Sequence, residues 1–201
     1  MMSQQINADD VASRRTAPNA ISEDVILDAA ATLMSTIGIR RTTMADVART
    51  ADVSRATLYR RFPNVEALAA QVTTREFEQI VATAPLGGGH TRHDLVATLV
   101  HLVREARTHP LLRRIIELDP EFLMPYLLHR TGRTARNQLA LVRSLLAAAQ
   151  DGGHVRPGDV DAMAATVLQM AWSFALTGPV FADPATLDSE LSDLLERYLR
   201  P

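Results

Sequence analysis

The residues with the clearest chemical potential are six arginines in the short stretch between Gly38 and Pro63. Asp46 and Asp52 are the acidic residues there, so six positive charges against two negative ones leave a local net charge of +4, in a chain whose net charge is −2. A guanidinium group pairs with phosphate oxygens and can donate two parallel hydrogen bonds to the edge of guanine. The stretch therefore indicates contact with nucleic acid. The arginines are Arg40, Arg41, Arg49, Arg55, Arg60 and Arg61.

A second candidate group combines His90, His93 and Asp94, because two histidines and a carboxylate could bind a metal ion. The glycine run Gly87–Gly89 precedes it, but this run lacks the Lys and Ser/Thr of a phosphate-binding loop, and no strand is predicted before it. Asp94 is better explained as part of a T-x-x-D helix start that begins at Thr91. The chain also offers no nucleophile beside a base. The sequence predicts no metal site, no cofactor and no enzyme activity.

The arginines fall on a predicted pair of short helices joined by a tight turn. A T-x-x-D signal at Thr43 starts the first helix, and Ser54 can cap the second. Asp52 falls where the chain must reverse, and aspartate tolerates left-handed backbone better than most residues. Leu58 and Phe62, four residues apart, would face the core. A basic second helix with small residues at its front suits the major groove of DNA, although charge and capping alone also allow a solvated helical hairpin.

Composition predicts an all-α fold. The chain has 201 residues, of which 47% are hydrophobic and only 4% aromatic, and Leu and Ala dominate. This balance favours helix over sheet. The N-terminal stretch lacks the apolar core of a secretory signal, and no apolar run is long enough to span a membrane. We expect a soluble, cytoplasmic protein without a membrane partner.

Glycine and proline divide the chain into three predicted parts. Residues 1–20 are polar and aperiodic, which predicts a flexible arm. Residues 21–84 would form a helix-turn-helix DNA-binding domain that includes a linking helix over 65–82. The break that begins at Pro85 separates it from residues 85–201, which would form a larger helical regulatory and dimerisation domain.

Caps and breaks divide the rear part into successive helices. Asp119 and Pro120 are placed as the cap and first residue of one of them. The last two helices are predicted from Asp159 to about Thr177 and from Asp183 onward. Both carry apolar stripes that need a cover, which could be the core of the same chain or a second copy of the chain.

The region of the helix pair resembles the DNA-binding module of the TetR family of transcriptional regulators, and the segment HPLLRRIIELDPEFLMPYL is also similar to many members. Two positions depart from the family pattern: Asp52 replaces a common Gly, and Val65 replaces a common Lys, so the phosphate contact of that Lys is not carried over. The matching residues are Gly38, Thr42, Thr43, Val47, Ala48, Ala51, Val53, Ser54, Thr57, Leu58, Tyr59, Phe62, Glu66, Ala67 and Leu68.

The resemblance implies a homodimer that binds double-stranded operator DNA, usually as a repressor, and that releases it on binding a small apolar or amphipathic effector. It implies that the last two helices pair with their copies in a four-helix bundle. It also implies a small-molecule pocket in the rear domain and transmission of its occupancy through the linking helix. A regulator without a small-molecule ligand, constitutive or controlled by a protein partner, remains the alternative.

Candidate site residues form three groups. The DNA-contacting candidates are Thr43, Ser54, Arg55, Ala56, Thr57, Tyr59, Arg60 and Arg61, with Arg55 expected to read a base and Ala56 to contact a thymine methyl. The pocket candidates, for which ordinary core packing is the alternative, are Met124, Tyr126, His129, Met170 and Trp172. The dimer-interface candidates are Met163, Val167, Met170, Phe174, Leu187, Leu191, Leu194 and Tyr198.

Overall fold

The computed structural model describes residues 23–85, 91–128 and 132–201, without the side chains of residues 126–128. The predicted arm over 1–20 and the glycine run at 87–89 lie outside these residues. The described chain is helical and contains no β-strand, as its composition predicts. The helices are α1 (Glu23–Ile37), α2 (Met44–Thr50), α3 (Arg55–Arg61), α4 (Val65–Thr83), α5 (Arg92–Thr108), α6 (Pro110–Leu118), α7 (Pro120–Leu128), α8 (Arg133–Asp151), α9 (Val160–Trp172) and α10 (Pro184–Tyr198).

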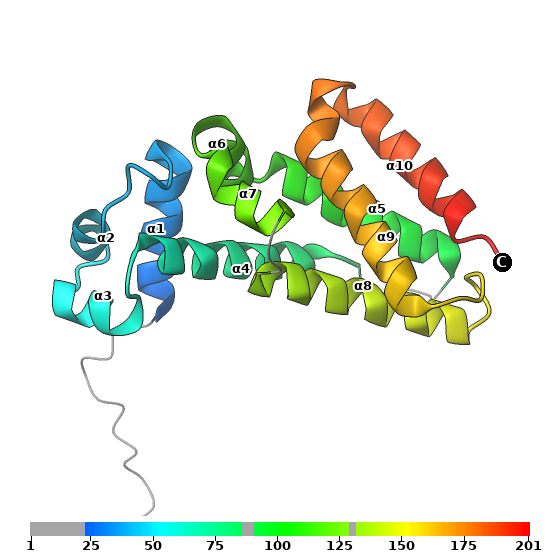
Figure 1. The fold of residues 1–201 in the computed structure, drawn as a ribbon, viewed down its shortest axis with the longest axis horizontal. Coiled ribbons are helices and arrows are strands. Elements are labelled where there is room, and N and C mark those ends of the chain that lie inside the picture. The colour runs from blue at the N-terminus through cyan, green and yellow to red at the C-terminus, as the bar shows by residue number, and fades with distance from the viewer. Residues whose placement is uncertain (1–22, 86–90, 129–131) are drawn as a thin grey trace, which may run out of the picture.

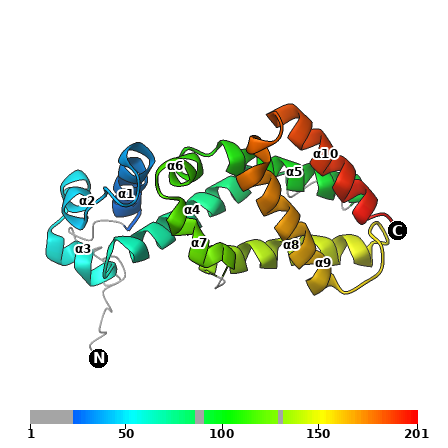
Figure 2. The same cartoon turned by 45° about the horizontal axis from the view of Figure 1, so that its top comes forward.

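The molecule is elongated, with α1, α2 and α3 gathered at one end (Figure 1). We call these three helices the head and α5–α10 the body. Helix α4 follows α3 and runs from the head into the body, where it contacts α5 and α8 (Figure 2). None of the described helices is both long and apolar enough to cross a membrane.

The buried side chains form two hydrophobic clusters. The front cluster joins the head to Leu68 and Val72 of α4, and to Leu111 and Ile115 of α6. The rear cluster joins α5, α8, α9 and α10. Because α6 packs against α1, the front core is not confined to residues 21–84, and the predicted boundary after residue 84 does not divide the two cores.

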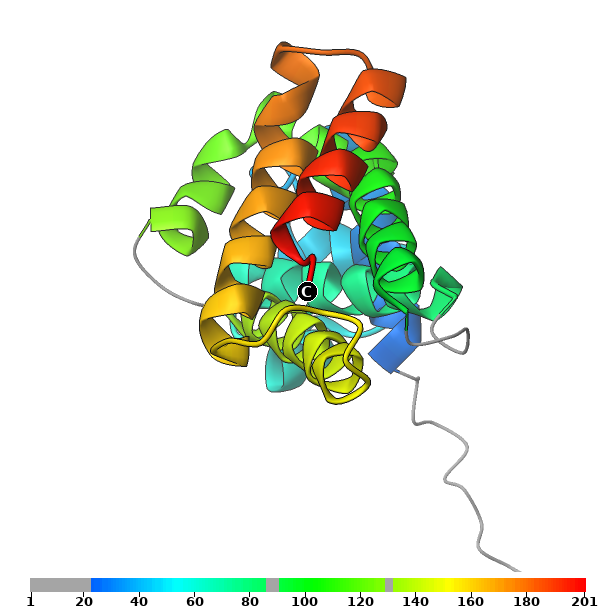
Figure 3. The same ribbon diagram turned by 90° about the vertical axis from the view of Figure 1, so that its right-hand side faces the viewer.

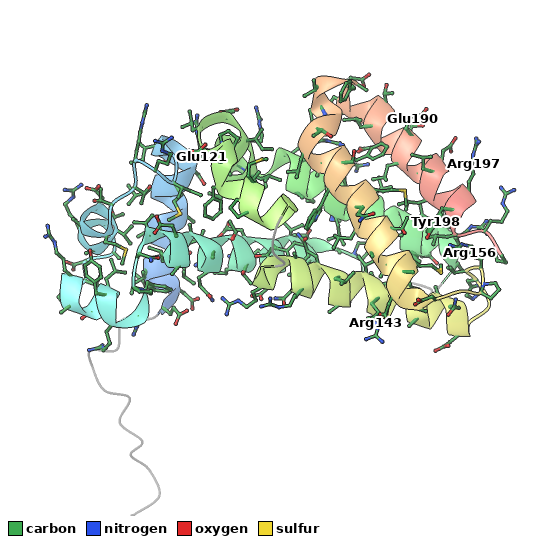
Figure 4. All side chains as sticks on the ribbon, viewed as in Figure 1. Glu121, Arg143, Arg156, Glu190, Arg197 and Tyr198 are labelled. Atoms are coloured by element: carbon green, nitrogen blue, oxygen red, sulfur yellow. The ribbon has the colours of Figure 1, made fainter. Side chains whose placement is uncertain are left out.

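The apolar stripes of α9 and α10 are largely covered by the chain's own core. Four predicted interface residues are at most 6% exposed: Met163, Val167, Leu187 and Leu191. They already pack inside one subunit, so a second copy is not what covers them. Met170, Phe174 and Tyr198 are half-buried against the rear cluster, and Arg156 lies 4.6 Å from the centre of the Tyr198 ring (Figure 4). Leu194, by contrast, is 44% exposed.

The helical segment that begins with α9 ends near Thr177, as predicted, but its last turn is a π-helix. Its α-helical part stops at Trp172, and a π-helical turn spans Ser173–Thr177. Such a widened turn is rare and occurs frequently at functional sites. Here it lies in the wall of the cavity described below, which Trp172, Ala175 and Leu176 line.

Candidate DNA-binding face and effector cavity

The turn between α2 and α3 is closed by hydrogen bonds around Asp52. Its φ of +52° is the only positive value for a residue other than glycine in the described chain. The Val53 N–H donates to the Ala48 carbonyl at 2.9 Å, and the Asp52 N–H donates to the Arg49 carbonyl at 3.3 Å. This is the paired pattern by which a left-handed residue ends a helix. Aspartate therefore makes the predicted turn without glycine.

The hydroxyl candidates for DNA contact also start the two helices. Ser54 Oγ accepts the Thr57 N–H at 3.1 Å and lies 2.9 Å from Thr57 Oγ1. The Thr43 hydroxyl accepts the Asp46 N–H at 3.1 Å and donates to Asp46 Oδ2 at 2.6 Å. The hydrogen bond from Thr43 holds the pKa of Asp46 below its ordinary value, and Arg49 contributes to the same shift. Both predicted helix starts are confirmed.

The outer face of α3 presents basic and small side chains to solvent. Leu58 is fully buried and anchors the helix in the front cluster, while Arg55, Ala56 and Arg60 are exposed. Within the described residues, neither Arg55 nor Arg60 makes a hydrogen bond or ion pair. Tyr59 is 53% exposed on the same short helix. The face has the composition expected of a helix that meets DNA.

Arg61 differs from the other two arginines of α3. It is only half-exposed, and its Nη1 atom is buried without a hydrogen-bond partner in the described chain. A guanidinium group in this position has less freedom to reach a phosphate than the exposed group of Arg60. This difference cannot be predicted from the sequence, because Arg60 and Arg61 are neighbours with the same side chain.

A cavity of about 470 Å³ lies where α4, α6, α7, α8 and α9 meet. Its volume falls within the range of small-molecule sites. Phe77 and Ile80 of α4 line it instead of packing into the front cluster. The other apolar lining residues are Ala67, Ala70, Ala106, Leu111, Leu112, Ile115, Phe122, Leu123, Ala135, Trp172, Ala175 and Leu176.

Polar groups occupy two parts of the cavity wall. On α4, Glu76 Oε1 accepts a hydrogen bond from Arg75 Nη2 at 2.9 Å, and Glu76 Oε2 lies 3.4 Å from His109 Nε2. The contact with His109 is the main cause that keeps the pKa of Glu76 below its ordinary value. On α8 and α9, Trp172 Nε1 donates to Gln138 Oε1 at 2.9 Å. The cavity can thus hold an apolar body and meet a few polar atoms.

Of the predicted pocket residues whose side chains are described, one lines this cavity. Trp172 lines it. Met124 is 47% exposed and Met170 packs against the rear cluster, and neither lines the cavity. Tyr126 and His129 lie outside the residues whose side chains are described.

The candidate metal group is engaged in other contacts where it can be described. His90 lies outside the described residues. His93 Nδ1 is 3.3 Å from Glu196 Oε1, and Asp94 is hydrogen-bonded to Thr91 at the start of α5. Across residues 23–85, 91–128 and 132–201, no group of three or more His, Cys, Asp or Glu side chains could hold a metal ion.

Comparison with known proteins points to one family. Residues 26–72 match the profile of the bacterial regulatory proteins of the tetR family. Over 177 residues, 87% of this chain and 92% of the relative, the sequence is 32% identical to an uncharacterized HTH-type transcriptional regulator of Mycobacterium tuberculosis. A Mycobacterium bovis protein with the same description matches at the same identity and coverage.

Solved structures show the same fold at low sequence identity. The ligand-free structure of RolR has a TM-score of 0.65 and 15% identity, covering 86% of this chain and 89% of RolR. The transcriptional regulator FadR of Bacillus subtilis, solved with stearoyl-CoA, has a TM-score of 0.62 and 16% identity, covering 89% of this chain and all of FadR. With a helix-turn-helix head and a helical body on one chain, this protein belongs to the TetR family of bacterial transcriptional regulators.

Proposed function

We propose that the protein is a homodimeric, sequence-specific repressor of the cytoplasm that a small apolar or amphipathic effector releases from its operator. Catalysis has no part in this role. The exposed face of α3 is the observation that carries the proposal, because Arg55 and Arg60 offer guanidinium groups to solvent and the helix contains no acidic residue. We assign residues 21–84 to DNA binding, helix 65–82 to linking, and residues 85–201 to regulation and dimerisation.

The position of each side chain on α3 suggests its contact with DNA. Arg55 occupies the first residue of the helix and would bond to guanine O6 and N7, while Ala56 would meet a thymine methyl. Contacts to phosphates set the register of the helix but carry no sequence information. We assign that role to Thr43, Ser54, Thr57, Tyr59, Arg60 and Arg61, with Arg61 limited by its partial burial.

The proposed dimer would use the outer face of α9 and α10. These helices lie side by side at the end of the molecule opposite the head (Figure 3). Exposed Leu194 and half-buried Met170, Phe174 and Tyr198 are the predicted interface residues that retain accessible surface. Two heads in such a dimer would present two α3 helices to successive major grooves, about 34–36 Å apart.

The cavity supports control by a small molecule over the alternative of a regulator without one. It is of ligand size, mainly apolar, and bordered by both hydrophobic clusters. Among proteins of the same fold, RolR has been solved with resorcinol and FadR with stearoyl-CoA. An effector that prefers one head arrangement would weaken DNA binding by its differential affinity for the two arrangements.

Selection of bound fragments from random DNA by the full-length protein tests this function. The expected result is enrichment of an inverted repeat whose half-sites are one helical turn apart. Sequencing should show the same repeat in independent selections. Recovery of fragments without a shared sequence would reject sequence-specific operator binding.

A further inference from the structure

The effector cavity contains an acidic side chain in a mainly apolar wall. Glu76 is the only acidic residue among the described residues that line the cavity, and its side chain is only 14% exposed. The neighbours of Glu76 do not use all the hydrogen-bond acceptor positions of its carboxylate. Oε1 accepts one hydrogen bond from Arg75, and Oε2 lies 3.4 Å from His109 Nε2. A carboxylate has about four acceptor positions on its two oxygens. Glu76 can therefore accept a further hydrogen bond from a bound molecule.

The charge of Glu76 also decides what the cavity excludes. The contact with His109 is the main cause that lowers the pKa of Glu76, and the hydrogen bond from Arg75 lowers it further. The carboxylate of Glu76 therefore stays ionised near neutral pH. A second anion placed beside it in a poorly hydrated site would be repelled, whereas a donor or cation would form a charge-assisted hydrogen bond. Arg133 also lines the cavity, but it is exposed, and solvent screens its charge.

We propose that Glu76 is the polar recognition group of the cavity and that the effector is an apolar molecule with a hydrogen-bond-donating group, neutral or cationic, and not an anion. This inference rests on the proposed role of the cavity as the effector site. It assigns a chemical class to the ligand and a specificity-determining residue to the site.

The same carboxylate is connected to the head. Arg75 donates to Glu76 with Nη2 and lies 2.8 Å from Asp28 Oδ1 with Nη1, and Nη1 also donates to the Asp24 carbonyl at 3.2 Å. Asp24 and Asp28 belong to α1. A ligand donor at Glu76 would share the carboxylate with Arg75, and would so change the charge that Arg75 faces while it holds α1 to α4. Glu76 would then both bind the effector and pass its presence on to the head.

Fluorescence of Trp172 offers a direct test, because it is the only tryptophan of the chain and it lines the cavity. Three probes share one apolar body and differ in head group: 6-phenylhexylamine, 6-phenylhexanol and 6-phenylhexanoate. Titrated into the full-length protein, the amine and the alcohol should change the fluorescence at concentrations at least about tenfold lower than the carboxylate, the equivalent of one charge-assisted hydrogen bond.

Two variants locate the effect. Glu76→Gln keeps the shape of the side chain and removes its charge, so it should weaken the amine and strengthen the carboxylate until the ranking is lost. Glu78→Gln is the matched control, the same substitution at an exposed residue of α4 that does not line the cavity, and it should leave the ranking unchanged. If Glu76→Gln does not fold, the ranking of the three probes on the natural protein still decides the matter.

The outcomes separate the inference from the proposed function. Binding of the carboxylate as tight as that of the amine, or an unaltered ranking in folded Glu76→Gln, would overturn the role of Glu76 and leave the cavity as an effector site. No fluorescence change with any probe would reject the cavity itself as a site for apolar effectors, and the inference with it. DNA selection is independent of both results.

Discussion

The carboxylate of Asp119 accepts a hydrogen bond from the backbone N–H of Ile39 at 2.6 Å, although 80 positions separate the two residues. Asp119 is 2% exposed at the junction of α6 and α7, and its second oxygen accepts the Arg40 N–H at 3.3 Å. Beside it, Arg40 forms an ion pair of 2.8 Å with Glu121, which is labelled at the start of α7 in Figure 4. The body thus holds the segment that leads into α2.

Replacing Asp119 tests this anchor. Asp119→Ala should lower the free energy of unfolding by about 2–3 kcal/mol, because it leaves a buried backbone N–H of Ile39 unpaired. Urea denaturation gives the value. Glu121→Ala is the control, since it removes an exposed ion pair from the same contact and should change stability little. Equal effects of the two substitutions would contradict the anchor.

Gly38 should resist substitution for two separable reasons. Its φ is +89°, and a Cβ atom there would lie 2.6 Å from Asp119 Oδ2. Gly153 has a φ of +70° with no atom within 4 Å of its Cβ position, so Gly153→Ala should cost only the backbone strain of about 1–2 kcal/mol. Gly38→Ala should lower the free energy of unfolding by more than this, because it adds the clash with Asp119 to the backbone strain.

The extra loss of unfolding free energy caused by Gly38→Ala, beyond that of Gly153→Ala, should disappear when Asp119 is also replaced by Ala, because the clash is then removed. A double-mutant cycle of Gly38→Ala and Asp119→Ala, followed by urea denaturation, measures this coupling. If Gly38→Ala costs the same with and without Asp119, the close approach is not what constrains this glycine.

Asp188 should stabilise the packing of α10 on α5. It pairs with Arg107, whose side chain is only 5% exposed, and with Arg104, which is half-exposed, both at 2.6 Å. Asp188→Asn should lower the free energy of unfolding by about 3 kcal/mol, because Arg107 stays buried without a charge partner. Arg104→Gln removes the exposed partner and should cost much less. A larger loss from Arg104→Gln would refute this ordering.

The contribution of Asp188 should also depend on pH in a known direction. Burial raises the pKa of this carboxyl, but the hydrogen bonds from Arg107 and Arg104 outweigh it, so the pKa is lowered overall from 3.8. The stabilisation is therefore present above pH 3.8 and is lost as the pH falls through the lower folded value. The stability difference between natural protein and Asp188→Asn should shrink on acidification. A difference that persists in strong acid would argue against the ion pair.

Local signals predicted the elements better than the contacts between them. Thr43, Ser54 and Asp52 act within a few residues of their own positions, so capping and turn rules were sufficient to place α2 and α3. Asp119 was identified as a local helix cap, but its bond to Ile39 depends on how α6 packs against α1. Side-chain spacing within one helix carries no information about such a partner.

The same limit applies to the cavity. Trp172 is among the pocket residues that the sequence predicts, whereas the pairing of Glu76 with His109 depends on α4 meeting the residue that precedes α6. The apolar stripes of α9 and α10 were identified correctly, but periodicity alone could not decide whether the subunit's own core or a second copy covers them. Burial of Leu191 inside the subunit decides that question for part of the stripe.

The affinity ratio between the selected DNA site and a scrambled site tests the central claim, base reading by α3, most directly. Arg55→Ala should lose about 1–3 kcal/mol on the selected site and much less on the scrambled one, so the ratio falls. Arg143→Ala, on α8 in the body (Figure 4), is the control of equal charge and should keep the natural ratio. Equal loss on both DNAs with Arg55→Ala, or no loss at all, would contradict the account.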